Sequence, residues 1–285
     1  MDKLKRSISS GKLSAGKILL YGFLIIFAVI QIYPFIWLVL FSLKSNSEIF
    51  GGNVAGLPEK FLWQNYKTAL INGKVGLYLL NSVIVTAATI AITSLVAGMA
   101  SYAIERMRWK YSKTVLVIFL MGLMIPLHAT LLPLFMFFAK IKQLNSYWSL
   151  ILPYAGFAMP MAMYILVGFL KGIPREMEES SLLDGCTIYG TFFRIMVPML
   201  KPAFATVAIF TFLSSWNELM FAITFISKTQ FRTLTVGLQN MVGQYITQWG
   251  PVGAGLVVAT LPTLIIYCFM SNEVQKSLIS GAVKG

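Results

Sequence analysis

Charged residues are scarce in this chain. Asp, Glu, Lys and Arg make up 12% of its 285 residues, whereas 57% of the residues are hydrophobic. A soluble domain carries roughly 25% charged residues, which cover its surface. Most of the surface of this protein therefore has to face something other than water, and the composition predicts a protein embedded in a lipid bilayer.

Cysteine and histidine are nearly absent. The chain has two cysteines, Cys186 and Cys268, and one histidine, His128. Two cysteines are too few for a disulfide framework and lack metal-ligand spacing, so we expect both to be packing residues. A transition-metal site or a serine-hydrolase triad has little to build from here. We expect no metal, no cofactor and no catalytic residues in this chain.

A phosphate-binding motif is imitated near the N-terminus but is incomplete. Residues 11–17 have the glycines and the lysine of such a loop, but Ile18 stands where Ser or Thr would bind magnesium. No strand precedes the segment, and a long apolar run follows it, so the context is wrong for a nucleotide site. The chain is not expected to bind ATP.

Long apolar runs are abundant, and a helix of about 20 apolar residues crosses a bilayer. Such segments must be helical because hydrocarbon cannot satisfy unpaired backbone groups. The six expected transmembrane helices are residues 18–41, 76–104, 114–138, 145–170, 199–227 and 252–271. The first run is about twice as long as a signal-peptide core, so we expect it to be retained. The predicted fold class is all-α: one polytopic membrane domain over residues 1–285.

The basic residues mostly lie in the segments before, between and after the apolar runs. Their unequal distribution over the two sides of the membrane predicts the orientation of the chain. With both termini in the cytoplasm, 15 of the 23 Lys and Arg residues fall on the cytoplasmic side and 8 on the outer side. Cytoplasmic loops carry the excess of positive charge, so this is the expected topology. It puts residues 171–198 in the cytoplasm. The net charge of +13 is spread in this way rather than gathered in one patch, and we expect no nucleic-acid partner.

Residues 171–198 are predicted to form a helical hairpin. Pro174 suits a first helical position, and three glutamates follow in the first turn, where the helix dipole favours acids. Gly185 after Asp184 can end that helix in the left-handed conformation. Thr187 can cap a second short helix that ends before Pro198. These residues alone leave two alternatives open, a segment that docks onto a partner and a solvated loop.

The same segment resembles the coupling loop of ATP-binding-cassette importer permeases. The family pattern is Glu-Ala-Ala, three residues, Gly, nine residues, Ile, one residue and Leu-Pro. Glu179, Gly185, Ile195 and Pro198 fall at these spacings. The chain departs from the pattern where serines 180 and 181 replace the two alanines and Val197 replaces the leucine.

Other stretches resemble the maltose-type sugar permeases, and specifically their second permease subunit. The corresponding residues are Leu57-Pro58, Asn65-Tyr66, Asn81-Ser82, Tyr102-Ala103 with Arg106, Pro126 to Pro133, Ser215 to Glu218 and Gly281 to Gly285. The resemblance implies a bacterial cell-membrane complex with a second homologous permease, two cytoplasmic ATPase subunits that hold ATP and magnesium, and an extracellular solute-binding protein. It also implies that the hairpin couples to the ATPases through Glu178, Glu179, Asp184, Gly185, Ile195 and Pro198.

Two polar places inside the apolar runs are candidates for the substrate path. Glu218 follows Trp216 and Asn217 in the fifth expected helix, and an ionisable residue within a span is a functional candidate. These residues could contact a sugar or make a structural hydrogen bond to the partner permease. His128, in the third expected helix, could contact a sugar or be a packing residue.

The substrate class and the transport mechanism have rival interpretations. A polyol, a glycerol phosphate or a uronate oligomer is an alternative to a sugar. An ion-coupled secondary transporter would need paired acids deep in several spans, and a membrane-embedded enzyme would need converging catalytic groups. Both are disfavoured, because the sequence offers neither.

Overall fold

The computed structural model describes residues 15–243 and 247–282, and it describes side chains from residue 16 to residue 269 with the same gap. Most of the basic N-terminal segment and of residues 11–17 lies outside these ranges. All regular structure within the described residues is helical. The predicted all-α class is confirmed.

Four helices are long and apolar enough to cross a bilayer on their own. They are α2 (Ala15–Ser42), α5 (Val75–Arg106), α8 (Trp148–Leu170) and α15 (Trp249–Ala282). They coincide with the first, second, fourth and sixth expected spans, with boundaries shifted by a few residues, and α15 runs well beyond residue 271. Two bent helix pairs raise the number of possible spans to six if each pair is counted as one.

The third expected span, residues 114–138, is not a straight helix. It is divided into α6 (Ser112–Met121), η2 (Gly122–Met124), η3 (Leu127–Thr130) and α7 (Leu131–Lys140). The two halves meet at an angle of 94°. Pro126 lies at the break and Ile125 before it has an extended backbone, as expected because a proline disfavours the helical conformation of the residue that precedes it.

The fifth expected span, residues 199–227, is not one helix, so this expectation is wrong. The helix α12 (Lys201–Trp216) ends eleven residues early, and the chain resumes as α13 (Met220–Phe225). The carboxylate of Glu218 accepts hydrogen bonds from the backbone N–H groups of Phe221 and Ala222. The new helix is thus started by a side-chain cap of the kind that satisfies orphan N–H groups at helix N-termini.

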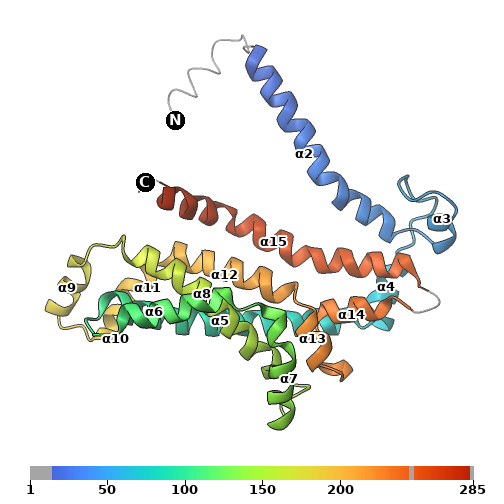
Figure 1. The fold of residues 1–285 in the computed structure, drawn as a ribbon. Coiled ribbons are helices and arrows are strands. Elements are labelled where there is room, and N and C mark those ends of the chain that lie inside the picture. Colours follow the sequence, from blue (N-terminus) through green and yellow to red (C-terminus); the bar gives the residue numbers. More distant parts are fainter. Residues whose placement is uncertain (1–14, 244–246, 283–285) are drawn as a thin grey trace.

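Short elements gather at the two ends of the elongated bundle (Figure 1). One end, the hairpin end, carries α9 (Glu176–Leu183), α10 (Ile188–Thr191), η4 (Phe192–Met196) and α11 (Val197–Met199). The opposite end, the far end, carries α3 (Asn46–Phe50), α4 (Gln64–Lys67), η1 (Thr68–Asn72), α14 (Leu234–Met241) and η5 (Thr229–Phe231).

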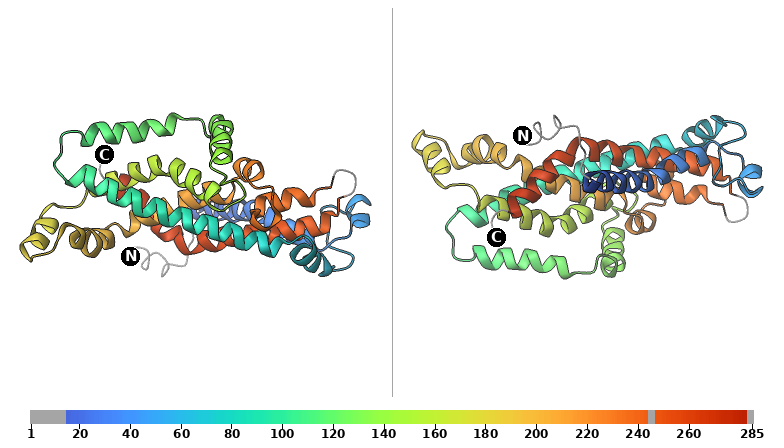
Figure 2. Two further views of the ribbon diagram at one scale, coloured as in Figure 1. Left: turned by 90° about the horizontal axis from the view of Figure 1, so that it is seen from below. Right: turned by 90° about the horizontal axis from the view of Figure 1, so that it is seen from above.

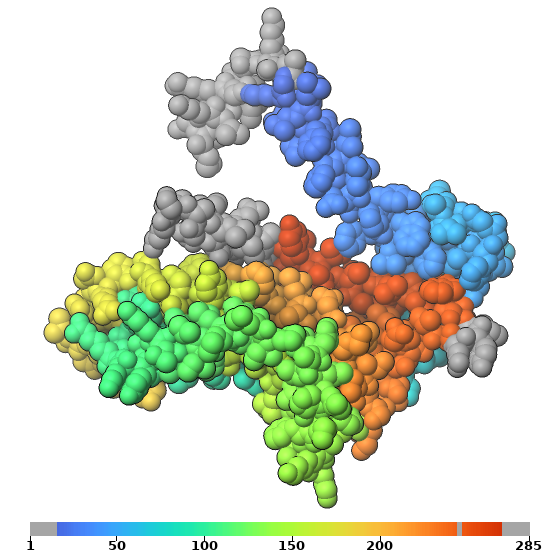
Figure 3. Space-filling model, viewed as in Figure 1, coloured from blue at the N-terminus to red at the C-terminus, as the bar shows by residue number. Residues whose placement is uncertain are grey.

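The core runs along α5, which packs on α8 and α12, while α12 packs in turn on α15. Near the hairpin end, Met163 and Leu166 of α8 and Met196 of η4 are fully buried in one cluster. By contrast, α2 packs on α15 near its own C-terminus and extends away from the bundle (Figure 1). In the view from above it therefore lies in front of the bundle (Figure 2). None of its most apolar 18-residue window is buried, and the space-filling view shows it standing apart (Figure 3).

Candidate functional site

The hairpin is built from local signals that the sequence carries. Gly185 adopts a left-handed φ of +81° and follows Asp184, the C-cap residue of α9. The N–H of Gly185 donates to the carbonyl of Leu182, and the N–H of Cys186 donates to that of Ser181. This pair of bonds is a Schellman motif, which satisfies the last carbonyls of a helix. The predicted stop at Asp184-Gly185 is confirmed.

The second arm of the hairpin begins at Thr187, whose hydroxyl accepts a hydrogen bond from the N–H of Gly190 at 3.2 Å. The predicted cap is confirmed. The predicted boundaries are less accurate, because α9 begins at Glu176 rather than Pro174. The second arm also does not end before Pro198: it continues to Met199 and then bends by 76° into α12.

The two arms are joined by small polar side chains. The hydroxyls of Ser181 and Thr191 lie 2.6 Å apart, and both residues are buried. Ser181 is one of the two serines that stand where the family pattern has alanines. It therefore contributes a hydrogen bond between the arms, which an alanine at this position could not make.

The outward face of the hairpin mixes an acid with large apolar side chains. Glu179, Asp184 and Gly185 are exposed, as is Pro198, while Ile195 is partly buried. Leu183 is 89% exposed and Tyr189 is 70% exposed. The structure thus gathers Glu179, Asp184 and Gly185 on one arm, and places Ile195 and Pro198 on the other arm near α12.

Glu178 points the other way. Its Oε1 lies 3.1 Å from Nε of Arg106, the last residue of α5, and its side chain is 13% exposed. The hydroxyl of Tyr102 lies 3.4 Å from the other carboxylate oxygen. Glu178 is therefore held inside the chain. The sequence alone does not reveal this pair, because an arginine at the end of a span can equally set the orientation of the chain or contact another side chain.

The candidates for the substrate path are not brought together. Trp216 is buried and its Nε1 donates to the carbonyl of Ala259 in α15 at 3.3 Å. Asn217 is exposed, and its amide donates to Leu213 of its own helix. Glu218 accepts a hydrogen bond from the hydroxyl of Tyr154 in α8. His128 is exposed on η3, and within the described residues no hydrogen bond joins it to these three.

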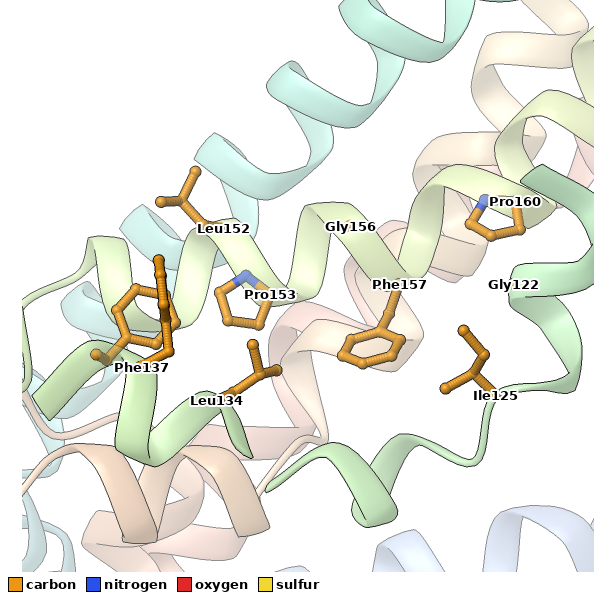
Figure 4. A pocket seen from close by; sticks show the side chains of 10 residues that line it. Gly122, Ile125, Leu134, Phe137, Leu152, Pro153, Gly156, Phe157 and Pro160 are labelled. Atoms are coloured by element: carbon orange, nitrogen blue, oxygen red, sulfur yellow. The ribbon is translucent and has the colours of Figure 1, made fainter. Parts of the chain in front are cut away.

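A cavity of about 380 Å³ lies between the bent pair α6–α7 and α8. Pro153 and Phe157 of α8 face Leu134 of α7 across the cavity, and Ile125 lines the cavity farther along α8, toward Pro160 (Figure 4). Its lining is apolar and supplies none of the side-chain hydroxyl, amide or carboxylate groups that orient a polar ligand. This cavity is not a candidate sugar site. In the part of the chain that the structure describes, no group of three His, Cys, Asp or Glu residues could hold a metal ion.

The fold and the site define a class: a polytopic helical membrane protein with a structured hairpin at one end of its bundle. The profile of the family described as "Binding-protein-dependent transport system inner membrane component" matches residues 94–276. The chain belongs to this family. The resemblance derived from the hairpin is confirmed, and the protein is a multi-pass membrane permease subunit.

Individual relatives agree over almost the whole chain. It is 36% identical to the probable ABC transporter permease protein YurM of Bacillus subtilis, with 95% of this chain and 89% of that protein covered. It is 33% identical to the sulfoquinovosyl glycerol transport system permease protein SmoH of Agrobacterium fabrum, with 95% of each covered. The fold also matches a crystal structure of a bacterial ABC transporter involved in the import of the acidic polysaccharide alginate. That match has a TM-score of 0.79 at 19% identity and covers 92% of this chain and 99% of that one.

Proposed function

We propose that this chain is the permease subunit of an ATP-driven importer that moves a sugar or oligosaccharide into the cell by alternating access. One observation carries the proposal: a structured hairpin at one end of the bundle exposes Glu179 and Leu183, one turn apart on α9, and also exposes Tyr189 on its second arm. Apolar side chains exposed next to an acid at the end of the spans are typical of a docking site for another protein. In this proposal the partner is a separate ATPase subunit, which alone binds ATP and magnesium.

The roles within the hairpin follow from exposure. Glu179 lies in the first turn of α9 and is exposed, so it can meet a basic group of the ATPase. Truncating one partner of a buried, hydrogen-bonded charge pair at an interface costs about 2–5 kcal/mol. Asp184 and Gly185 shape the tip, and Ile195 and Pro198 lead into α12. When the ATPases close on ATP, the hairpin moves with them and the spans rock between two arrangements.

The orientation of the chain belongs to the same proposal. The excess of Lys and Arg on one side favours both termini, and with them the hairpin, in the cytoplasm. The far end would then face outward, where an extracellular solute-binding protein delivers its ligand to this chain and a second, homologous permease.

The solute class is proposed from the relatives. SmoH is named for sulfoquinovosyl glycerol transport, and the maltose-type resemblance of the sequence points in the same direction. A polyol, a glycerol phosphate and a uronate oligomer remain the alternative solutes.

A tag on this chain tests the partners. Purified from the membranes of its host in mild detergent, the wild-type chain should bring an ATPase subunit that hydrolyses MgATP. Glu179→Arg should lose that subunit while the chain stays in the membrane. Glu59→Arg makes the same charge change at an exposed position of the far end and should retain it. A wild-type chain that carries no ATPase would contradict the proposal.

Uptake tests the solute. Cells with and without the gene should be compared for uptake of labelled maltotriose, glycerol 3-phosphate and a uronate disaccharide. If cells without the gene lose only the uptake of maltotriose, the solute is an oligosaccharide. If they lose only the uptake of glycerol 3-phosphate or only that of the uronate disaccharide, that compound represents the solute class.

A further inference from the structure

The end of α5 is fastened to the hairpin by one buried arginine. Arg106 is the last residue of α5, and its side chain is 4% exposed. Its Nε lies 3.1 Å from Oε1 of Glu178 in α9. The two atoms do not form a hydrogen bond with each other, so this contact is an ion pair.

The other end of the same guanidinium binds α8 and the connection that follows it. Nη2 of Arg106 donates to the carbonyl of Ile173 at 2.7 Å and also to the carbonyl of Leu170. Leu170 is the last residue of α8, and the last carbonyls of a helix have no partner within it. The Leu170 carbonyl also accepts the N–H of Ile173, and Arg106 adds a cation at this point, which the helix dipole favours at a C-terminus.

Arg106 therefore joins three elements at one point: the end of α5, the end of α8 and the first turn of α9. The chain itself connects the hairpin to α8 and α12, but it does not connect the hairpin to α5. Besides Arg106, Tyr102 contributes to that link, since it approaches Glu178 and packs its ring 5.2 Å from that of Phe192. Phe192 also lies in one apolar cluster with Ala97 and Ile104 of α5. Arg106 therefore supplies the charged part of the link and Phe192 the apolar part. A lysine could not replace the arginine, because a single ammonium cannot present a planar fork of donors to acceptors on different sides.

We infer that Arg106, paired with Glu178, is the positioning residue that makes the hairpin, α8 and α5 move as one body. The inference rests on the proposed function, since it concerns how motion of the ATPase reaches the spans. Two distant sites are coupled when both act on the same structural element, and when that element has discrete arrangements whose equilibrium each site shifts. A hairpin held only by the chain segments that lead into it would follow the ATPase without moving α5. Motion of α5 matters because α8 and α12 pack on it.

The importer purified through a tag on this chain allows a test that needs no solute. Backbone hydrogen exchange is measured for the hairpin and for the last turns of α5, with and without MgATP plus vanadate. In the wild type, the trapped nucleotide should change exchange in both segments. In Arg106→Gln and Arg106→Lys, exchange in residues 176–183 should be about tenfold faster or more, because the segment opens locally. The response of α5 to nucleotide should be lost while the ATPase stays bound. Arg108→Gln, two residues along and exposed, is the matched control.

Each outcome decides something. If Arg106→Gln behaves as Arg108→Gln, with the response of α5 intact, the inference is overturned. If Arg106→Gln does not assemble, Glu178→Gln decides, because it removes only the opposite charge: an intact response overturns the inference and a lost response supports it. A wild-type chain that binds no ATPase overturns the proposed function instead, so the two failures are distinguishable.

Discussion

The hydroxyl of Tyr154 in α8 donates a hydrogen bond to the carboxylate of Glu218 in the break between α12 and α13. The same carboxylate accepts from the N–H groups of Phe221 and Ala222 at 2.8 and 3.1 Å. The side chain of Glu218 thus caps the N-terminus of α13 and joins it to α8 by a hydrogen bond. Hydrogen bonds to a partly buried carboxylate offset the cost of removing it from water.

Glu218→Ala should therefore destabilise the protein. It leaves the Tyr154 hydroxyl and two backbone N–H groups without their acceptor, and an unsatisfied buried group costs about 1–3 kcal/mol. Tyr154→Phe removes one bond and should cost about 0.5–1.5 kcal/mol. Thermal unfolding of the purified importer measures both, with Asn217→Ala as the control at the exposed neighbour. An unchanged unfolding temperature for Glu218→Ala, together with weaker solute uptake, would instead assign Glu218 to the substrate path.

The turn of the hairpin depends on glycine at one position. Gly185 has a φ of +81°, and a β-branched residue forced into that conformation costs about 1–3 kcal/mol. Gly185→Val should open the turn and abolish transport through loss of the bound ATPase, measured by co-purification. Gly185→Asn should be tolerated, because asparagine adopts the left-handed conformation more readily. Gly168→Ala is the control, since a Cβ there meets nothing within 4 Å. Full ATPase recovery with Gly185→Val would refute this account of the turn.

The contact of α14 with α5 depends on a second glycine. A Cβ on Gly237 would lie 2.0 Å from Cδ2 of Tyr78, so Gly237→Ala forces α14 away from α5. Overpacking of this kind costs about 1–3 kcal/mol and should lower the unfolding temperature of the importer. Tyr78→Ala makes room, so the double variant should be less destabilised than the sum of the two single variants. If the destabilisation of the double variant equals the sum of the two single variants, residues 237 and 78 do not contact each other.

The second arm of the hairpin depends on its cap. Thr187→Ala removes the acceptor for the N–H of Gly190 and should cost about 1 kcal/mol of local stability. Hydrogen exchange at Gly190 and the next residues should accelerate accordingly, whereas Thr187→Ser should remain close to the wild type. Equal exchange in all three proteins would show that the cap contributes nothing to the hairpin.

Local signals made the four uninterrupted spans and the turn of the hairpin predictable. A helix such as α8 needs only a run of apolar residues of sufficient length, and the turn needs only Gly185 and Thr187 at the right spacing. The third and fifth spans were harder to predict, because hydropathy does not distinguish one continuous apolar helix from two apolar helices joined by a break. Pro126 lies at the first break, but a proline alone does not predict one, because α8 continues through Pro153 and Pro160. The capping role of Glu218 has no local sequence signal.

The sequence by itself determined an all-helical membrane protein with a hairpin between its fourth and fifth apolar runs, because composition and short-range spacing are properties of neighbours along the chain. That the chain is a permease subunit came from its resemblance to the importer permeases and from the family profile. Only the tertiary structure decided that Glu178 turns inward to Arg106, that Glu179 faces outward, and that Glu218 binds Tyr154. Each of these choices depends on residues far apart in sequence. Burial gives such pairs their strength, because a charge or carboxylate shielded from water must find its partner wherever the fold brings one.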